Sequence, residues 1–393
     1  MEKIVYTDGT KVCMLDKNGQ KIERESGFIA KYKENSRRIY ENNAWKRDGM
    51  NARLRGDYDF GENNEWSESE TPAILNGVTF TSQENVAAYS FTVGQSSGIY
   101  YKDFSREKDD ETHLIHSSSE QFFALSYNPK DRTMSASMRK NGDVCESVVV
   151  FTENGDYIDI TDGDSLDQNP YCSPTDGKIL FDSAGVGRDE RGNFVTYGNS
   201  AVFETDRFTA NISLLKEDEK YSYLRPKRDK EGNLYAVKRP AKEKSETNPI
   251  LEILLIPVRI VEAIVGFVQF FVVLFAGKTL VAGKGGGVNP AREKKITERE
   301  IFLDGNRVRV DKELKKNKRF KEKDYGFVPR SRKLVKLSKD GAETVLKNGV
   351  ADYAIGEEGI YCTDGRHIYL LAENECKKLA DVDFCLHLDV ERK

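Results

Sequence analysis

The two ends of the chain carry the same short β motif, and this repeat restricts the fold more than any other feature. One copy, from Ile4, reads IVYTDGTKVCMLDKNGQKI; the other, from Ile360, reads IYCTDGRHIYLLAENECKKL. Each has an apolar strand, a T-D-G turn, a second apolar strand, and a polar turn before a third strand. Asp-Gly between alternating apolar runs predicts a tight hairpin, because Gly tolerates the positive φ such a turn needs. The matching ends therefore predict a fold built from a repeated β module.

Further copies of part of this module lie between the ends. They are GVTFTSQENVAAYSF from Gly77, FFALSYNPKDRTMSASM from Phe122, NPYCSPTDGKILFDSAG from Asn169, YSYLRPKRDKEGNLYAVKRP from Tyr221 and KLVKLSKDGAETVL from Lys333. The starts at 77, 122, 169 and 221 differ by 45, 47 and 52 residues. This spacing suits one four-stranded blade per repeat, which is typical of a β-propeller.

The two ends also predict how the ring closes. The segment FCLHLDV, from Phe384, offers a single last strand, while the N-terminal unit supplies only three strands. Together they complete one shared blade. With blades beginning near 77, 122, 169, 221 and 350, we expect an all-β, six-bladed propeller closed by the N- and C-terminal strands. A seventh blade is possible if residues 26–73 contain one, and a pair of β-sandwich domains is the alternative fold.

The stretch SPTDGKILF, Ser173 to Phe181, resembles the WD-repeat-like units of TolB-type six-bladed propellers, in which Ser-Pro-Asp-Gly-Lys-x-Ile-x-Phe is typical. NPKDRTMSA and PKRDKEGNLYAV are looser matches. The resemblance implies an architecture only, because propellers carry many unrelated activities.

Residues 26–73 interrupt the repeats, and we expect an irregular loop over one face of the ring. Their first part mixes Arg and Lys with aromatic residues, and an acidic part follows from Asp57 to Glu70. Aromatic and basic side chains together can stack on nucleotide bases, but the acidic part would oppose a phosphate backbone. The whole chain has a net charge of -4. No nucleic-acid partner is therefore expected.

Residues 241–325 form a second interruption, between segments that read as consecutive strands of the fifth blade. The propeller then comprises residues 1–240 and 326–393. Within the insertion, Asn248 and Gly277 bracket an apolar helix over 249–276, which Pro257 kinks or splits. The 27 residues from Ile250 to Ala276 would span roughly 40 Å as a continuous helix.

This helix has the pattern of an element that lies in a membrane surface. Its longest uncharged stretch, 263–277, has 15 residues, fewer than the roughly 20 that a span needs. The polar residues from Glu252 to Gln269 fall in one third of the circumference, and the rest is apolar. A single span would also place two halves of one ring on opposite sides of the bilayer. The residues expected to contact lipid or a partner are Ile250, Leu254, Ile256, Ile260, Ile264, Phe267, Phe270, Phe271, Leu274 and Phe275.

Basic residues accompany the helix. The tract 291–325 is rich in Lys and Arg, and from Ala291 to Lys339 there are 18 Lys and Arg against 8 Asp and Glu. Basic side chains close to an anionic membrane each favour binding by about 1 kcal/mol. A solvated helix or loop is the alternative interpretation of this tract. The expected basic flank of the helix is Lys278, Lys284, Arg292, Lys294 and Lys295.

No catalytic or cofactor motif is present. His113 and His116 differ by three positions, so on a regular strand they would face opposite sides. The four Asp residues of DITDGDSLD, from Asp159 to Asp167, lack a full calcium loop and read as a turn between blades. Six widely spaced Cys residues predict reduced core thiols, and no cofactor or metal is expected. The N-terminus has no signal-peptide pattern, so a cytoplasmic location is the expectation.

The hypothesis is therefore a non-catalytic propeller scaffold or sensor. It would attach to the cytoplasmic membrane surface as a peripheral or monotopic protein and bind an unknown protein partner. Three alternatives stay open: a hydrolase-like enzyme with a site in the propeller funnel, an apolar helix that docks on a hydrophobic partner or a second copy, and a single-pass membrane protein.

Overall fold

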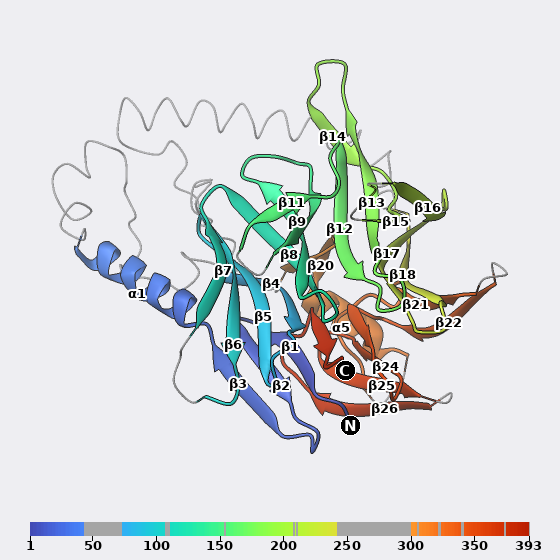
Figure 1. The fold of residues 1–393 in the computed structure, drawn as a ribbon. Coiled ribbons are helices and arrows are strands. Elements are labelled where there is room, and N and C mark those ends of the chain that lie inside the picture. Colours follow the sequence, from blue (N-terminus) through green and yellow to red (C-terminus); the bar gives the residue numbers. More distant parts are fainter. Residues whose placement is uncertain are drawn as a thin grey trace, which may run out of the picture. The chain divides into compact units, whose positions relative to one another are not determined.

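The computed structural model describes most of the chain outside two long segments (Figure 1). One compact unit comprises Met1–Tyr32, Thr71–Ala241 and Glu300–Lys393; a second comprises Lys33–Glu70 and Lys242–Arg299. The described residues are 1–42, 73–106, 111–152, 155–206, 209, 211–241, 300–304, 306–320, 324–338, 342–372 and 375–392. The predicted helix 249–276 and all fifteen of its predicted contact and flank residues lie outside them.

The first blade is closed by the two ends of the chain. The last strand pairs antiparallel with the first, with Ile4 opposite Val390 and Tyr6 opposite Leu388. The prediction that both termini share a blade is confirmed. In sheet order the strands are β27 (Leu388–Val390), β1 (Ile4–Asp8), β2 (Lys11–Leu15) and β3 (Lys21–Glu25).

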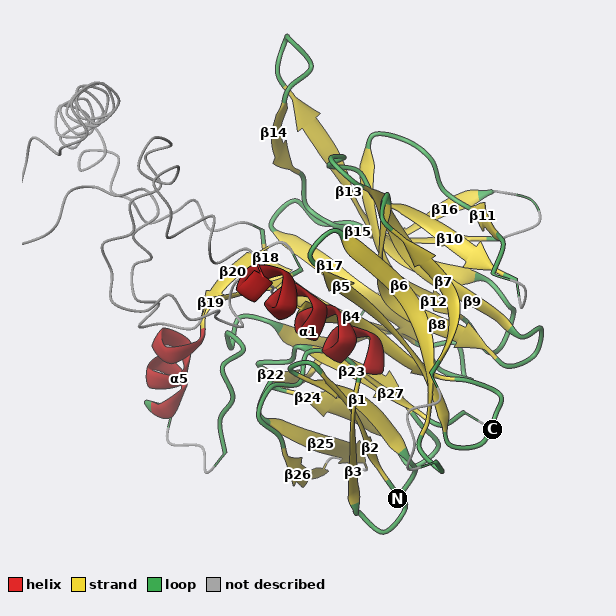
Figure 2. Cartoon of the chain, turned by 90° about the vertical axis from the view of Figure 1, so that its left-hand side faces the viewer, coloured by secondary structure: helices red, strands yellow, loops and turns green. Residues whose placement is uncertain are grey.

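The next three blades follow in chain order, each an antiparallel sheet (Figures 1 and 2). The second is β4 (Ala73–Phe80), β5 (Val86–Val93), β6 (Ser96–Asp103) and β7 (Thr112–Ser117). The third is β8 (Glu120–Asn128), β9 (Thr133–Lys140), β10 (Ser147–Phe151) and β11 (Tyr157–Asp159). The fourth is β12 (Ser165–Cys172), β13 (Ile179–Arg188), β15 (Ala201–Thr205) and β16 (Ile212–Lys216), with β14 (Phe194–Tyr197) paired to the far end of β13.

The last two blades complete six among the described residues, so the propeller prediction is confirmed. The stretch from Asp159 to Asp167 connects β11 of the third blade to β12 of the fourth, as expected for a turn between blades. The fifth blade is β17 (Tyr221–Arg228), β18 (Leu234–Pro240), β21 (Lys333–Leu337) and β22 (Glu343–Asn348). The sixth is β23 (Asp352–Ile355), β24 (Ile360–Thr363), β25 (His367–Ala372) and β26 (Glu375–Asp381).

A separate apolar cluster fills each of the six junctions between neighbouring blades. Phe91 packs with Val5 between the first and second blades, and Phe181 packs with Val150 between the third and fourth. The four other junctions hold equivalent clusters, including the one between the sixth and first blades. Because strands alternate their side chains, a blade presents apolar residues to both neighbours. The closed ring therefore gives every blade a packing partner on each face.

Part of the first interruption is a helix rather than the expected irregular loop. Helix α1 spans Gly27–Asn42 (Figure 2). Ser26 begins it, because its Oγ accepts a hydrogen bond from the N–H of Ile29 at 3.2 Å. Phe28 then packs on Phe91 of the second blade, with ring centroids 5.1 Å apart. A buried cap and an apolar first turn thus order a segment that looks irregular in sequence. Residues 43–72 lie outside the described part.

The insertion leaves and rejoins the fifth blade between two strands that are hydrogen-bonded neighbours. Strand β18 pairs antiparallel with β21, although 92 residues lie between Pro240, the last residue of β18, and Lys333, the first residue of β21. After residue 299 the chain forms the hairpin of β19 (Glu300–Leu303) and β20 (Asn306–Arg309), then helix α5 (Val310–Lys318). Leu303, Val308 and Val310 pack with Phe327 in a small core of their own.

Helix α5 carries part of the predicted basic tract. Its Lys312, Lys315, Lys316 and Lys318 are exposed, whereas Asn317 is buried. The Nδ2 of Asn317 donates to the carbonyl oxygens of Gly326 and Val328, at 2.8 and 3.0 Å. One face of α5 is thus fastened to the chain that follows, and its lysines face solvent. No helix in the described ranges is long and apolar enough to cross a bilayer.

Candidate functional site in the central channel

The innermost strands of four blades each contain a β-bulge beside the same small channel cavity. Pairing shifts register after Leu75 in β4, Phe123 in β8, Gln168 in β12 and Leu224 in β17. A bulge adds one residue that has no pairing partner and re-aims its side chain. The extra residues Ala124, Asn169 and Arg225 have φ values of 47, 51 and 54°. Each bulge thus leaves one residue of its strand without a pairing partner, beside the channel.

At this level Arg225 is the centre of a buried ion network. Its guanidinium lies 2.9 Å from a carboxylate oxygen of Asp304 and 3.2 Å from Asp352, and only 6% of its side chain is exposed. Arg332 contacts the second oxygen of Asp304 at 2.5 Å. Arg239 donates to the backbone carbonyl of Asp304 at 2.9 Å. Asp304 belongs to the turn of the β19–β20 hairpin, so the insertion supplies a carboxylate to this ion network.

The network shifts the proton affinities of its members. Burial by itself would raise the pKa of Asp304, but Arg225 and Arg332 outweigh it and hold that pKa well below its usual range. Burial raises the pKa of Asp182 to about 7, although its Oδ1 accepts from the N–H of Arg225 at 2.8 Å. Burial, reinforced by Arg225, lowers the pKa of His387 to about 4. At neutral pH His387 is therefore an uncharged neighbour of the arginine.

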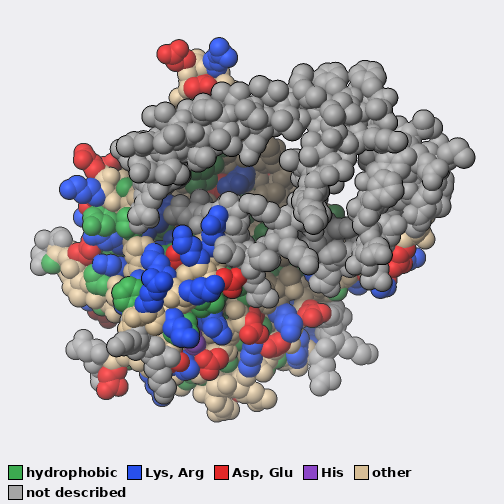
Figure 3. All heavy atoms as spheres, turned by 180° about the vertical axis from the view of Figure 1, so that it is seen from behind, with side chains coloured by type: hydrophobic (Ala, Val, Ile, Leu, Met, Phe, Trp, Pro, Cys, Tyr) green, Lys and Arg blue, Asp and Glu red, His purple; other side chains and the backbone are tan. Residues whose placement is uncertain are grey.

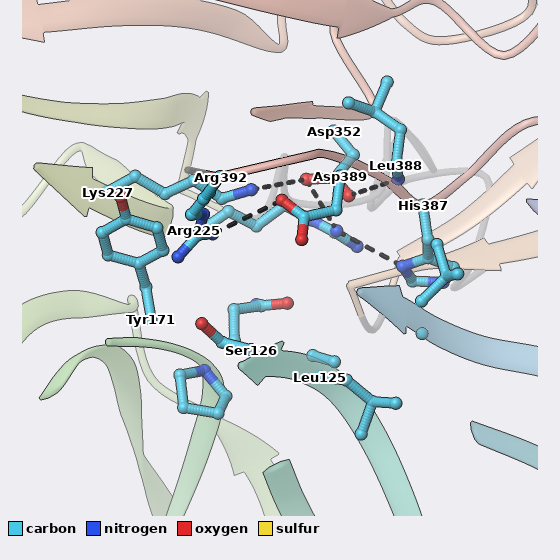
Figure 4. A pocket seen from close by; sticks show the side chains of 15 residues that line it. Leu125, Ser126, Tyr171, Arg225, Lys227, Asp352, His387, Leu388, Asp389 and Arg392 are labelled. Carbon is cyan, nitrogen blue, oxygen red and sulfur yellow. Dashed lines mark hydrogen bonds and ion pairs between the residues drawn. The ribbon is translucent and has the colours of Figure 1, made fainter. Parts of the chain in front are cut away.

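Two adjoining cavities, together called the funnel, lie beside these residues, and Figure 4 shows the side chains that line the inner one. The outer recess has a cavity volume of about 770 Å³, and the inner channel cavity has about 40 Å³. Tyr171 and Arg392 line both cavities, so the two cavities meet at these side chains. The Arg392 guanidinium stacks over the Tyr171 ring, 4.7 Å from its centroid, and contacts Asp389 at 3.4 Å. The recess bears charges of both signs, among them Glu2, Lys130, Arg228, Lys230, Glu231, Glu357 and Glu391.

The channel residues are engaged with one another. Asp352 accepts from the N–H of Leu388 at 3.1 Å, in addition to its contact with Arg225. The Nδ1 of His387 lies 3.5 Å from Arg225. A general base needs a proton of the substrate within hydrogen-bond reach, and these groups face each other instead. Arg225, Asp352 and His387 are therefore held by one another in this structure.

Sequence reasoning did not identify any of these channel residues. A signal was present in the dipeptides Asn76-Gly77, Asn169-Pro170 and Arg225-Pro226, which occupy the same position in three of the repeats. Such residues are typical of irregular strand positions. Asp304 carried no such signal, because its role depends on where the insertion returns to the ring.

Two expectations about reactive side chains were wrong in part. A register shift after Ile99 places a bulge in β7, and both His113 and His116 lie near the Tyr100 ring, at centroid distances of 5.8 and 6.4 Å. They are not on opposite sides.

All six cysteines are free thiols, and four are buried as expected. Cys145 is half-buried in the connection before β10, and Cys376 is exposed because it lies on β26, the last strand of its blade.

Comparison with known proteins supports the fold and extends no further. No protein-family model matches the chain, and no curated protein matches its sequence. Among solved structures, the chain is similar to one in a nidogen/laminin complex, with a TM-score of 0.51, 8% identity, and coverage of 99% of this chain and 98% of that one. TolB from Acinetobacter baumannii is similar with a TM-score of 0.49 and 10% identity, over 99% of this chain and 66% of that chain, just under two thirds of its length. The six sheets of the described residues give the chain its six-bladed propeller architecture, and the similarity to the chain of the nidogen/laminin complex concerns this fold alone.

Proposed function

We propose that this protein is a non-catalytic binding propeller attached to the cytoplasmic surface of a membrane. Residues 249–276 would be the anchor, and the basic flank and the lysines of α5 would strengthen it. The observation that carries the proposal is the pairing of β18 with β21 on either side of the insertion. Because both strands belong to one blade, the apolar segment leaves the ring and returns to it on the same side of a membrane.

The described ends of the insertion support this geometry. Arg239 lies at the end of β18, where the insertion begins, and donates to the carbonyl of Asp304, in the hairpin that follows residue 299. The exit and the return are therefore adjacent. A segment that enters the membrane interface and comes back satisfies this constraint, whereas a single span does not.

A basic surface also belongs to the insertion. Figure 3 shows Lys and Arg side chains gathered around α5. Anionic headgroups attract such a surface within about a Debye length, roughly 8 Å at physiological salt. Burying even five large apolar side chains would add about 1.5–3 kcal/mol each. Anchoring should therefore persist when salt screens the lysines.

The funnel is the proposed contact site for a protein partner. Its lining combines charged residues with apolar ones that include Pro129, Ile355 and Leu371. Protein interfaces likewise combine apolar contacts with polar and charged ones. Because the channel residues beneath it are engaged with one another, the funnel is proposed to bind without catalysis.

Liposome flotation of the full-length chain tests the anchor. We expect the protein to float with vesicles that contain anionic lipid, and to remain bound after the salt concentration is raised. Replacing residues 248–290 with a short Gly-Ser linker should leave a folded ring that no longer floats. A full-length variant with Phe270→Asp and Phe271→Asp should also stay at the bottom of the gradient.

The alternatives give different results. A protein that stays unbound to vesicles but elutes as a dimer or larger complex would show that the apolar segment docks on protein. Protease protection of residues 300–393 in sealed membrane vesicles would establish a single span. Either result would overturn the proposed attachment.

A further inference from the structure

Three side chains suited to metal binding meet at one end of the sixth blade. Asp324 follows α5 in the chain, His367 begins β25, and Asp381 ends β26. One ligand atom from each lies within 4.8 Å of the others. His367 and Asp381 are opposite each other in the β25–β26 pairing. Two of the three residues are thus placed opposite each other by the β25–β26 pairing.

The ring of His367 is oriented by a carboxylate outside this group of three. Its Nδ1 lies 2.9 and 3.1 Å from the two oxygens of the buried Asp364. Asp364 also accepts from the Tyr369 hydroxyl and from the N–H of Arg366, each at 2.9 Å. Because the carboxylate accepts, Nδ1 carries a hydrogen, and in the neutral ring Nε2 is the nitrogen left to bind a metal. A carboxylate bound to the other nitrogen is the usual support of a metal-binding histidine.

The Nε2 atom faces negative charge. It lies 3.5 Å from Oδ1 of Asp381. A cation placed between Nε2 and this carboxylate would be attracted by both. The ammonium of Lys378 supplies a positive charge here, at 2.9 Å from Asp324 and 3.1 Å from Asp381. Lys378 is one third exposed, so its flexible side chain can turn into solvent.

We propose that His367, Asp324 and Asp381 bind one Zn²⁺ ion in exchange for the Lys378 ammonium. Imidazole nitrogen and carboxylate oxygens are common zinc ligands, and three protein ligands leave a fourth position for water. Asp381 is largely exposed, which gives the ion a path from solvent. The bound ion would connect the chain that follows the insertion to the sixth blade. This site lies apart from the funnel and is independent of the proposed anchoring.

Metal titration of the purified, tag-free full-length protein tests the site. We expect one equivalent of Co²⁺ to produce the visible absorption of a four-coordinate ion, and Zn²⁺ to abolish it by displacement. His367→Gln should remove the spectrum, and Asp324→Asn should weaken binding. Lys378→Met removes the competing ammonium and should bind more tightly than the unmodified protein. His113→Gln, at a histidine in another blade, should bind as the unmodified protein does.

Circular dichroism and thermal unfolding of each metal-free variant will show that the ring is folded. The proposal is overturned if His367→Gln retains the same Co²⁺ spectrum, since binding would then occur elsewhere. It is also overturned if the unmodified protein binds neither ion at millimolar concentration. Binding by Lys378→Met alone would show that the lysine permanently replaces the metal, and this too would reject a native site.

Discussion

Replacing Asp304 with Asn tests whether the insertion hairpin stabilises the propeller through the buried ion network. Asn has the same shape as Asp but no charge. It also tolerates the left-handed backbone, φ 46°, that residue 304 adopts. The substitution therefore removes the carboxylate charge without demanding a new backbone conformation.

The contacts of Asp304 set the expected loss of stability. Removing one partner of a buried ion pair typically costs about 3–5 kcal/mol, because the other charge stays buried. Arg225 would keep Asp352 at 3.2 Å. Arg332 would keep only weak hydrogen bonds to the carbonyls of Val350 and Ala351, at 3.3 and 3.5 Å. With one arginine still paired, we expect a loss of about 3 kcal/mol, the lower end of that range.

Acid should reduce the difference in stability between the unmodified protein and the Asp304→Asn variant. The pKa of Asp304 in the folded protein is depressed: burial raises it, and Arg225 and Arg332 lower it by more. The carboxylate of Asp304 therefore makes its full contribution to the free energy of unfolding above about pH 4, which is the pKa of Asp in the unfolded chain. This contribution declines as pH falls below that value. The Asp304→Asn variant lacks this titrating carboxyl and so lacks its pH dependence. The gap in stability should narrow below about pH 4.

Urea unfolding, followed by circular dichroism at pH 7, measures the loss of stability. The control is Glu357→Gln, which removes an exposed ion pair with Lys230 and should leave the urea midpoint unchanged. A midpoint for Asp304→Asn equal to that of the control would refute the reasoning. So would a difference that stays constant down to pH 3.

Three further changes follow from the packing and the channel. Gly77→Ala should destabilise the ring by about 1–3 kcal/mol, since its Cβ would lie 2.9 Å from backbone nitrogens of the next blade; Gly185→Ala, with open space, should have little effect in the same urea assay. Phe327→Ala should cost about 3–5 kcal/mol in thermal unfolding, because Phe327 is buried, whereas the exposed Phe320→Ala should not shift the melting temperature. His387 has a pKa lowered to about 4 by burial and a neighbouring arginine, so the unfolded chain takes up its proton first as pH falls. Stability should drop by roughly 3 kcal/mol between about pH 6.5 and 4, and His387→Gln should lack this slope; an unchanged slope would contradict the assignment.

Much of the ring was predictable from local pattern. The blades expected near 77, 122, 169, 221 and 350 begin at Ala73, Glu120, Ser165, Tyr221 and Asp352. Strand alternation and Asp-Gly turns act over a few residues, so they are visible without tertiary information. Helix α1 was missed because its first turn packs on the ring while its capping serine stands in an otherwise polar segment.

The repeats alone determined that the chain forms a closed β ring with shared termini, because a blade exposes apolar faces that only neighbouring blades can cover. Tertiary structure alone decided the channel. The register shifts in four inner strands select which side chains enter it, and the hairpin that returns from the insertion brings Asp304 to Arg225 across 79 positions of sequence. Ion pairs between such distant residues depend on where whole blades and the insertion meet, and no local pattern records that.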